Sequence, residues 1–227
     1  MSRAAHTLKG VIFQGSTRAR RVGPKVTAAV VNQLEARGNF ELTVIDPRTH
    51  ENGFFMRLLE KPLFHYKEGE EVPGALTRTG ALVAEADFFI TVTPEMNHTI
   101  APGLVSTMSH FGSAAYSFKP SGVVTYSAGL WGGARAGVAL RPFLSELGCL
   151  PVSSVVSVPG AIKAMGGVAG DGEHTGGAEV RELPETSSKM LDRMLDQLEW
   201  QARSLRDARE RDGPPTQSYF EQVRLRK

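Results

Sequence analysis

The chain has 227 residues, a formal net charge of +2 and 41% hydrophobic residues, which suits one globular domain with its own core and excludes a disordered chain. Its densest basic stretch, at residues 18–25, falls in one loop, so no nucleic-acid partner is expected. The single cysteine, Cys149, excludes an intrachain disulfide and is typical of a reducing, cytoplasmic setting. No apolar run reaches the length of a membrane span, and no signal segment is expected.

Short apolar runs alternate along the chain with segments of helical periodicity. In chain order, we expect a strand at residues 8–14, a helix at 22–37, a strand at 40–45, a helix at 73–86, a strand at 87–93, a helix from about residue 102, a strand at 122–127, a helix at 134–147, a strand at 152–158 and a long amphipathic helix at 184–209. Pro94 ends the third strand in this interpretation. The alternation predicts an α/β three-layer sandwich with a five-stranded parallel sheet, and one of the commonest orders for such a sheet is the flavodoxin-like 2-1-3-4-5.

Three segments fall outside this alternation. Residues 49–72 form a long irregular connection, and connections of this length are often functional. Residues 159–182 are glycine-rich and acidic, which predicts a surface excursion. We expect residues 1–209 to form one domain and residues 210–227 to form an extended C-terminal tail.

Polar loops follow the first, third and fourth predicted strands. They read QGSTRARRVG, TPEMNH and SAGLWGG. In the order 2-1-3-4-5 these three loops are neighbours at the carboxyl edge of the sheet, where open parallel sheets bind their ligands. Their convergence predicts a ligand site there, which no single loop would do.

The first loop combines Ser16 with the cations Arg18 and Arg21, and a helix begins near Gly23. Hydroxyls, cations and a helix start suit a phosphate group. A solvated basic turn is the alternative interpretation. The loop has neither G-x-G-x-x-G nor G-x-x-x-x-G-K-[ST], which disfavours a Rossmann dinucleotide site or a P-loop.

The second and third loops offer groups for a flat ligand. Backbone amides and Asn97 in the second loop can pair with a planar ring, although Asn97 can also simply cap the next helix. In the third loop, Ser127 and Gly129 allow close approach and Trp131 can stack, while a plain glycine-rich turn is the alternative. The histidines show no metal-ligand spacing, so no metal is expected.

Taken together, these loops resemble the NADPH-dependent FMN reductase family of flavodoxin-like proteins. The matching segments are GSTRARRVG at residues 15–23, TPEMNH at 93–98, YSAGLWGGARAG at 126–137 and LRPFLSELG at 140–148. The resemblance implies bound FMN, with NADPH or NADH as the hydride donor and a quinone, free flavin or similar small molecule as the electron acceptor. It names no catalytic residue, because the hydride chemistry belongs to the flavin.

The resemblance also implies a role for each loop. Ser16 and Arg18, with the backbone around Gly23, would hold the FMN phosphate, and Arg21 adds a second cation. A stretch of the second loop would line the ring and its ribityl chain: Pro94, Glu95, Met96 and Asn97. The pyrimidine end would be bordered by Ser127, Gly129 and Trp131. Met96 stands where the family usually has tyrosine, which leaves open an alternative, an FMN-binding redox sensor or scaffold with little turnover.

Family members are generally dimers or tetramers, and the last predicted helix favours a homodimer or homotetramer as well. Its apolar face is formed by Met190, Leu191, Met194, Leu195 and Leu198. Trp200 extends this face, and the tail carries Tyr219 and Phe220, so we expect apolar surface beyond what the sheet needs. In an oligomer, the connection at residues 49–72 would help cover the flavin of its own or the neighbouring subunit through Phe64, His65 or Tyr66.

Overall fold

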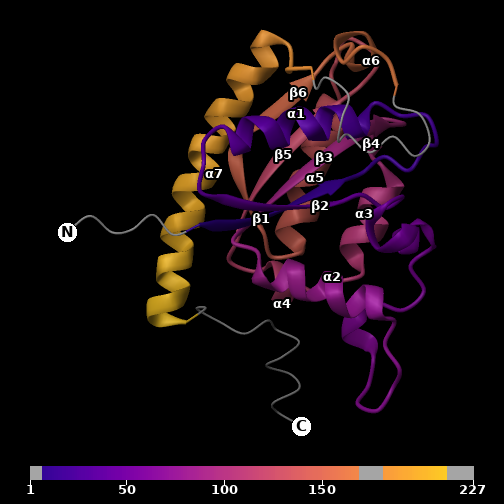
Figure 1. Ribbon diagram of the computed structural model, residues 1–227, viewed down its shortest axis with the longest axis vertical. Helices are drawn as coiled ribbons and strands as arrows, with labels where there is room; N and C mark the ends of the chain where they lie inside the picture. Colours follow the sequence, from indigo (N-terminus) through magenta and orange to yellow (C-terminus); the bar gives the residue numbers. More distant parts are fainter. Residues whose placement is uncertain (1–6, 169–180, 214–227) are drawn as a thin grey trace.

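The computed structural model describes residues 7–168 and 181–213 (Figure 1). In chain order its elements are β1 (Leu8–Gln14), α1 (Gly23–Glu35), β2 (Phe40–Ile45), the 3-10 helices η1 (His50–Met56) and η2 (Leu63–His65), α2 (Gly74–Glu85), β3 (Phe88–Met96), β4 (Thr99–Ile100), α3 (Pro102–Ser109), α4 (Ser113–Tyr116), β5 (Pro120–Tyr126), α5 (Ala134–Glu146), β6 (Leu150–Val158), α6 (Ala161–Ala164) and α7 (Glu185–Asp212). Half of the surface excursion predicted at 159–182, residues 169–180, lies outside the described residues, as do Tyr219 and Phe220.

The strands are ordered β2-β1-β3-β5-β6 and every neighbouring pair in this path is parallel. This confirms the predicted flavodoxin-like order. Helices α1 and α7 pack on one face of the sheet, and α2, α3 and α5 pack on the other (Figure 1). The central strands are buried on both faces, which is why β3 and β5 appear in the sequence as continuous apolar runs.

The prediction that Pro94 ends the third strand is wrong. Strand β3 continues to Met96 and then pairs with the short antiparallel strand β4. The Gly15 N–H donates to the Val92 carbonyl at 2.9 Å, so Val92 and, two residues on, Pro94 present their backbone polar groups toward β1. Strand β1 has already ended at Gln14, and the missing N–H of Pro94 therefore costs no ladder bond.

The last helix is longer than predicted, and its exposed face differs from the prediction. It continues to Asp212, three residues into the segment that we expected to be an extended tail.

Four of the predicted apolar residues are buried in the core: Leu191, Met194, Leu195 and Leu198. Trp200 is 71% exposed, because it lies nine residues after Leu191 and an advance of about 100° per residue turns it half a turn away. Met190 is also exposed. The apolar face of α7 is therefore formed by the four buried residues, and it packs in the core of this chain instead of facing solvent.

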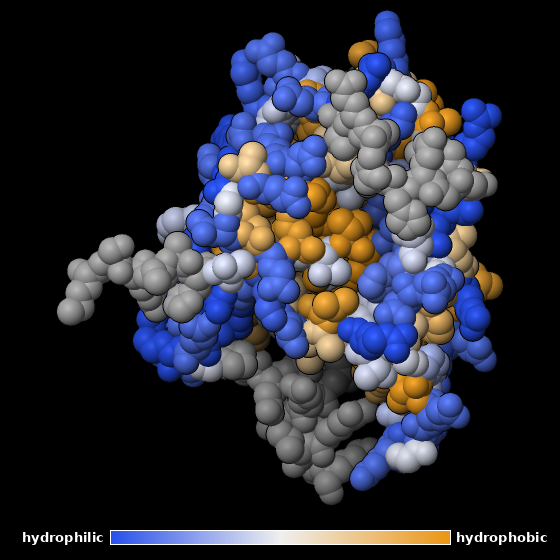
Figure 2. Space-filling model, in the orientation of Figure 1, coloured by the Kyte–Doolittle hydropathy of each residue, from blue (hydrophilic) through white to orange (hydrophobic). Residues whose placement is uncertain are grey.

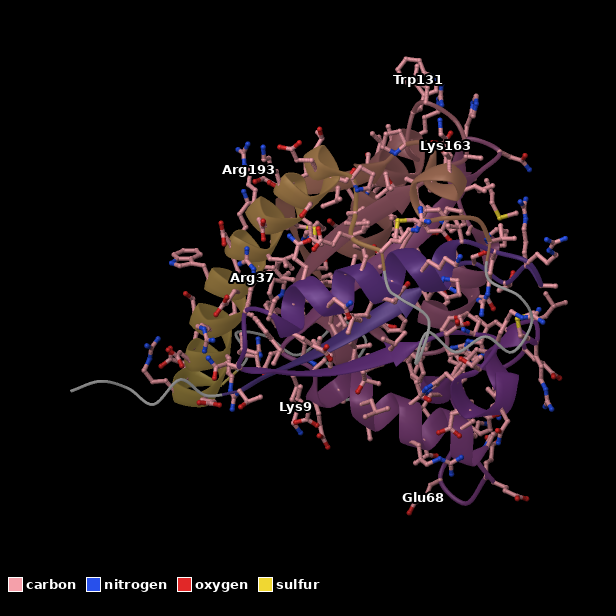
Figure 3. All side chains as sticks on the ribbon, turned by 45° about the horizontal axis from the view of Figure 1, so that its top comes forward. Lys9, Arg37, Glu68, Trp131, Lys163 and Arg193 are labelled. Carbon is pink, nitrogen blue, oxygen red and sulfur yellow. The ribbon has the colours of Figure 1, made fainter. Side chains whose placement is uncertain are left out.

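One edge of the sheet is left unpaired at β2. Apolar side chains gather there on the face shown in Figure 2, where Val44 is exposed and Phe40 and Leu42 are partly buried. At the carboxyl edge of the sheet, Trp131 and Lys163 lie together, well away from Lys9 at the start of β1 (Figure 3). The predicted ligand loops belong to this carboxyl edge.

Candidate ligand site at the carboxyl edge of the sheet

Three loops meet at the carboxyl edge: loop 1 (residues 15–22), loop 2 (residues 94–98) and loop 3 (residues 127–133). Loop 1 packs tightly on the start of α3, because a Cβ atom added to Gly103 would lie 2.4 Å from Thr17 Cγ2 and 3.1 Å from the Gly15 carbonyl oxygen. Loops 2 and 3 are joined through Glu95 and Arg135, whose side chains form an ion pair of 3.1 Å. The predicted convergence of the three loops is present in the structure.

A buried ion pair fixes the shape of loop 1. Arg21 donates from Nη1 to Asp46 Oδ1 at 2.8 Å and from Nη2 to Oδ2 at 2.7 Å, and the two side chains are only 8% and 13% exposed. Arg21 also donates to the Ser16 carbonyl. The Gln14 side chain accepts from the Ser16 N–H, and its Nε2 donates to the Ser16 carbonyl and to Asp46, each at 3.3 Å. We call Gln14, Arg21 and Asp46 the brace.

The brace sets the direction of the loop 1 peptide groups. The Ser16 carbonyl points into the brace, and the Thr17 carbonyl accepts from Arg48 Nη1 at 3.2 Å. No peptide bond of the described ranges is cis, and a trans peptide group points its C=O and N–H in opposite directions. The Thr17 N–H shares the peptide plane of the Ser16 carbonyl and therefore points away from the brace. The Arg18 N–H shares the plane of the Thr17 carbonyl and therefore points away from Arg48. No acceptor in the described part of the chain takes up the N–H groups of Thr17, Arg18 and Ala19.

The side chains predicted from loop 1 occupy different surroundings. Arg21 lies in the brace, where Asp46 and Ser16 occupy its guanidinium. Ser16 is buried, whereas Arg18 is exposed and no residue in the described ranges forms an ion pair with it. Among the described residues, loop 1 thus presents the cation of Arg18 beside three N–H groups without acceptors, a combination that suits an anion.

The start of α1 contributes less than its sequence suggests. Gly23 is the first helical residue, Pro24 has no N–H group, and the Lys25 N–H donates to the Val22 carbonyl at 3.0 Å. Most of the free donors at this edge therefore come from loop 1. A Cβ atom at Gly23 would lie 2.5 Å from the hydroxyl oxygen of Tyr126, so glycine is needed there for the close approach of these two residues.

Loop 2 is a tight β-hairpin between β3 and β4. Asn97 and His98 form its two-residue turn, with φ of 49° and 64°. These left-handed conformations match a type I′ turn, which asparagine tolerates well. Asn97 therefore does not cap the next helix, whose flanking residue is Ala101. Met96 is half-buried at the end of β3, with its backbone paired to Thr99.

Glu95 connects loop 2 to the start of α5. Its carboxylate accepts from the Arg135 N–H at 3.0 Å and from Arg135 Nη1 at 3.1 Å. Gly133 flanks the helix and has no side chain to cap it, so Glu95 supplies the anion that favours a helix N-terminus. Burial raises the pKa of Glu95, but the hydrogen bonds from Arg135 outweigh it and hold the pKa below its usual value. Glu95 thus orients loops 2 and 3 relative to each other.

Loop 3 has a rigid base and an exposed tip. Ser127 Oγ donates to the Gly129 carbonyl at 3.1 Å, and the Gly160 N–H donates to the same carbonyl at 3.0 Å. Trp131 is 65% exposed, with the Arg135 guanidinium 5.6 Å from the centre of its ring. This cation–π contact holds the indole at the mouth of the site.

The aromatic residues of the long connection lie elsewhere in this chain. Phe64 packs against Gly112, beyond the end of α3 that is opposite to loop 2, and the Leu63 N–H donates to the His110 carbonyl at 2.8 Å. Phe64, His65 and Tyr66 therefore do not cover the carboxyl edge of their own subunit.

Other chemistry is sparse in the described ranges. No cluster of three potential metal ligands is found among residues 7–168 and 181–213. Within the same ranges, no helix combines the length and apolar character that a membrane span requires. Burial raises the pKa of the Cys149 thiol to about 12, so this cysteine is poorly suited to act as a nucleophile.

The fold and the three loops define a flavodoxin-like α/β protein with polar loops gathered at the carboxyl edge of a parallel sheet. Residues 8–163 match the family model described as NADPH-dependent FMN reductase. This match covers more than half of the chain, so the chain belongs to that family. A search of curated proteins gives no match.

Solved structures of flavoenzymes share the fold. FerB from Paracoccus denitrificans, described as a flavoenzyme NAD(P)H:(acceptor) oxidoreductase, aligns with a TM-score of 0.61 at 19% identity over 86% of this chain and 98% of its own. The NADH:FMN oxidoreductase EMOB aligns with a TM-score of 0.59 at 14% identity, over 87% and 90% of the two chains. An oxidoreductase from Corynebacterium diphtheriae aligns with a TM-score of 0.57 at 14% identity, over 88% and 98%.

The residues at this edge fit a flavin mononucleotide. The free N–H groups of Thr17, Arg18 and Ala19 and the Arg18 charge suit its phosphate. Tyr126, buried beside Gly23, carries a hydroxyl without a hydrogen-bond partner in the described part of the chain. Loops 2 and 3 provide backbone and an exposed indole for a flat ring.

Sequence reasoning had overlooked several residues at this edge. Asp46 follows the second strand and therefore lies beside loop 1, a position that the strand order alone would have indicated. Tyr126 precedes Ser127 at the end of the fourth large strand, but its hydroxyl was not considered as a ligand. The pairing of Glu95 with Arg135 had no signal in the sequence.

Proposed function

We propose that this chain is an FMN-dependent NAD(P)H oxidoreductase that moves hydride from NADPH or NADH through bound FMN to a small-molecule acceptor. The observation that carries the proposal is the braced loop 1, with its free N–H groups and Arg18, at the edge where loops 2 and 3 also converge. Membership in the NADPH-dependent FMN reductase family supports the same chemistry.

Each loop has a separate task in this proposal. Ser16, Arg18 and the backbone before Gly23 hold the phosphate, while Arg21 acts indirectly through the brace. Residues 94–97 lie along the ring and ribityl chain, and Glu95 holds them in position relative to the start of α5. Ser127, Gly129 and Trp131 border the pyrimidine end of the ring. When bound, FMN supplies two-electron hydride transfer, so the chain itself needs to bind, orient and shield rather than to provide a catalytic acid.

The acceptor is proposed to be a quinone, a free flavin or a similar flat molecule. FerB is described as an NAD(P)H:(acceptor) oxidoreductase and EMOB as an NADH:FMN oxidoreductase, which supports this range of acceptors. Trp131 at the mouth of the site offers a stacking surface for such a molecule. We include a homodimer or homotetramer and a cytoplasmic location in the proposal, with light scattering as the test of assembly.

The experiment is a spectroscopic titration of the purified chain. The protein reconstituted with FMN is expected to show a flavin spectrum, to bleach anaerobically with NADPH or NADH, and to regain its colour with a quinone. Comparing the two nucleotides at equal concentration measures the donor preference. A chain that takes up no FMN, or whose bound FMN neither nucleotide reduces, would overturn the proposal.

The alternative is a flavin-binding redox sensor with little turnover. The observation that favours it is Met96, which provides no aromatic face or hydroxyl beside the ring. Steady-state oxidation of NADPH with a quinone separates the two functions, because a sensor gives one reduction per flavin and an enzyme gives many. A Met96→Tyr variant tests whether this side chain limits turnover.

A further inference from the structure

Tyr126 is the last residue of β5, and its hydroxyl has no hydrogen-bond partner within residues 7–168 and 181–213. The side chain is only 3% exposed and its ring packs in the core beneath α1. Buried hydroxyls are nearly always hydrogen-bonded, so an unpaired one needs an explanation. Phenylalanine would fill the same space without this penalty.

Two of the acceptors near this hydroxyl are already engaged, and the third, the Ser16 hydroxyl, is near enough to lower the pKa of Tyr126 without meeting the geometry of a hydrogen bond. Gln14 lies beside it, since both contact the Cβ position of Gly23, but Gln14 Oε1 accepts the Ser16 N–H. Asp46 influences Tyr126 through its charge, yet both of its carboxylate oxygens accept from Arg21. The hydroxyl hydrogen therefore has no free acceptor in the brace.

The chemical state of the hydroxyl suits an anion. Burial raises the pKa of Tyr126 far above its usual value, although Ser16, Arg21 and Arg18 act in the opposite direction. The phenol is therefore neutral near physiological pH, where it is a hydrogen-bond donor.

We propose that the Tyr126 hydroxyl donates a hydrogen bond to the phosphate of FMN bound at loop 1, and so makes the site select FMN over riboflavin. The proposal rests on the proposed function. The hydroxyl is shielded from solvent, so a phosphate oxygen reaches it only with a small adjustment of loop 1. Within the described ranges, the N–H groups of Thr17, Arg18 and Ala19 have no hydrogen bonds to break during that adjustment.

The test compares Tyr126→Phe with Tyr116→Phe, which removes a hydroxyl from an equally buried tyrosine. Tyr116 packs in the opposite core and donates to the Met108 carbonyl at 2.9 Å. Dissociation constants for FMN and riboflavin are measured by quenching of flavin fluorescence, together with the melting temperature of each flavin-free protein. Neither variant changes the charge of the protein.

Tyr126→Phe is expected to weaken FMN binding roughly tenfold to a hundredfold, as the loss of one hydrogen bond to a charged group, and to leave riboflavin binding unchanged. Its flavin-free melting temperature is expected to equal or exceed that of the unaltered chain, because no hydrogen bond is lost. Tyr116→Phe is expected to lower the melting temperature and to keep the ratio of FMN to riboflavin affinity.

Two results would overturn the inference. One is a Tyr126→Phe protein with the unaltered ratio of FMN to riboflavin affinity. The other is an equal loss of both affinities with a lower melting temperature, which marks a purely structural tyrosine. Failure of the proposed function is distinguishable, because in that case the unaltered chain binds neither flavin.

Discussion

Replacing Arg21 with methionine tests whether the brace shapes loop 1. The change keeps most of the aliphatic stem but removes the two hydrogen bonds to Asp46 and the one to the Ser16 carbonyl. The Asp46 carboxylate, 13% exposed, is then left without its cation. Breaking a buried ion pair costs about 3–5 kcal/mol. We expect about 3 kcal/mol here, because Gln14 and the Arg48 N–H still donate to Asp46.

Urea unfolding measures this loss, with Lys189→Met as the control. Lys189 pairs with Glu185 at the surface, where the side chains are 75% and 83% exposed, and such a pair contributes at most about 0.5 kcal/mol. Arg21→Lys is expected to restore only part of the stability, since an ammonium group cannot reproduce the two-pronged contact with Asp46.

The same variant tests the link between the brace and the ligand. Without Arg21, the Ser16 carbonyl keeps only the 3.3 Å hydrogen bond from Gln14, so its direction is held less firmly, as is that of the Thr17 N–H in the same peptide plane. Binding of FMN is expected to weaken about tenfold, the effect of one misdirected hydrogen bond to a charged group, and riboflavin binding is expected to change little. An Arg21→Met protein that loses under about 1 kcal/mol in urea and binds FMN normally would refute the assignment of the brace.

Three further predictions concern other parts of the molecule. Arg18→Ala is expected to weaken FMN binding roughly tenfold to a hundredfold and to change riboflavin binding little. Arg20→Ala removes the same charge from the same loop and is expected to leave the ratio of FMN to riboflavin affinity near that of the unaltered chain. Equal effects of the two substitutions in fluorescence titrations would contradict a specific contact of Arg18. The lowered pKa of Glu95 means that its ion pair stabilises the fold fully above the usual pKa of 4.5 and that this contribution is lost as the pH falls through the lowered value. The stability difference between the unaltered chain and Glu95→Gln, measured in urea, is therefore expected to shrink on acidification, and a difference that stays constant would argue against the role of Arg135. Burial lowers the pKa of His110, so the stability of the fold is expected to fall as the pH drops below the usual pKa of 6.5. His110→Phe is expected to flatten that part of the pH profile of thermal melting. An unchanged slope would show that protonation of His110 does not cause the loss of stability.

The fold could be predicted because its signals are local and redundant. The central strands are continuous apolar runs, and the alternation with helices allows few arrangements of a parallel sheet. The order of the strands then brings loops 1, 2 and 3 to one edge without any knowledge of side-chain positions. The convergence in the structure is a consequence of topology.

The wrong predictions came from local sequence rules that contacts in the tertiary structure override. Proline normally ends a strand, because it has no N–H to donate. At Pro94 the missing N–H would point toward β1, which ends at Gln14 and does not extend that far, so β3 continues to Met96. Trp200 follows an apolar stretch in the sequence, yet the helical advance turns it to solvent. Asn97 precedes a helix but belongs to a hairpin, since β4 was too short to be recognised.

The roles of the loop 1 arginines could not be separated from the sequence. Arg18 and Arg21 have the same chemistry and lie three residues apart, so either can serve as the phosphate cation. The structure separates them through Asp46, which comes from another strand and occupies Arg21. Only the position of β2 beside β1 places that carboxylate, and no feature within loop 1 indicates it.

The buried Arg21 and the exposed Arg18 can serve a bound anion in different ways. An anion is held best by donors that already point at it, because they lose little freedom on binding. Arg21 cannot itself reach the ligand while Asp46 holds it, but by drawing the Ser16 carbonyl inward it turns the next N–H outward. Arg48 does the same for the Thr17 carbonyl and the N–H of Arg18. Two cations, Arg21 and Arg48, therefore orient neutral donors of the loop, and the exposed Arg18 remains available to offer its charge to the ligand.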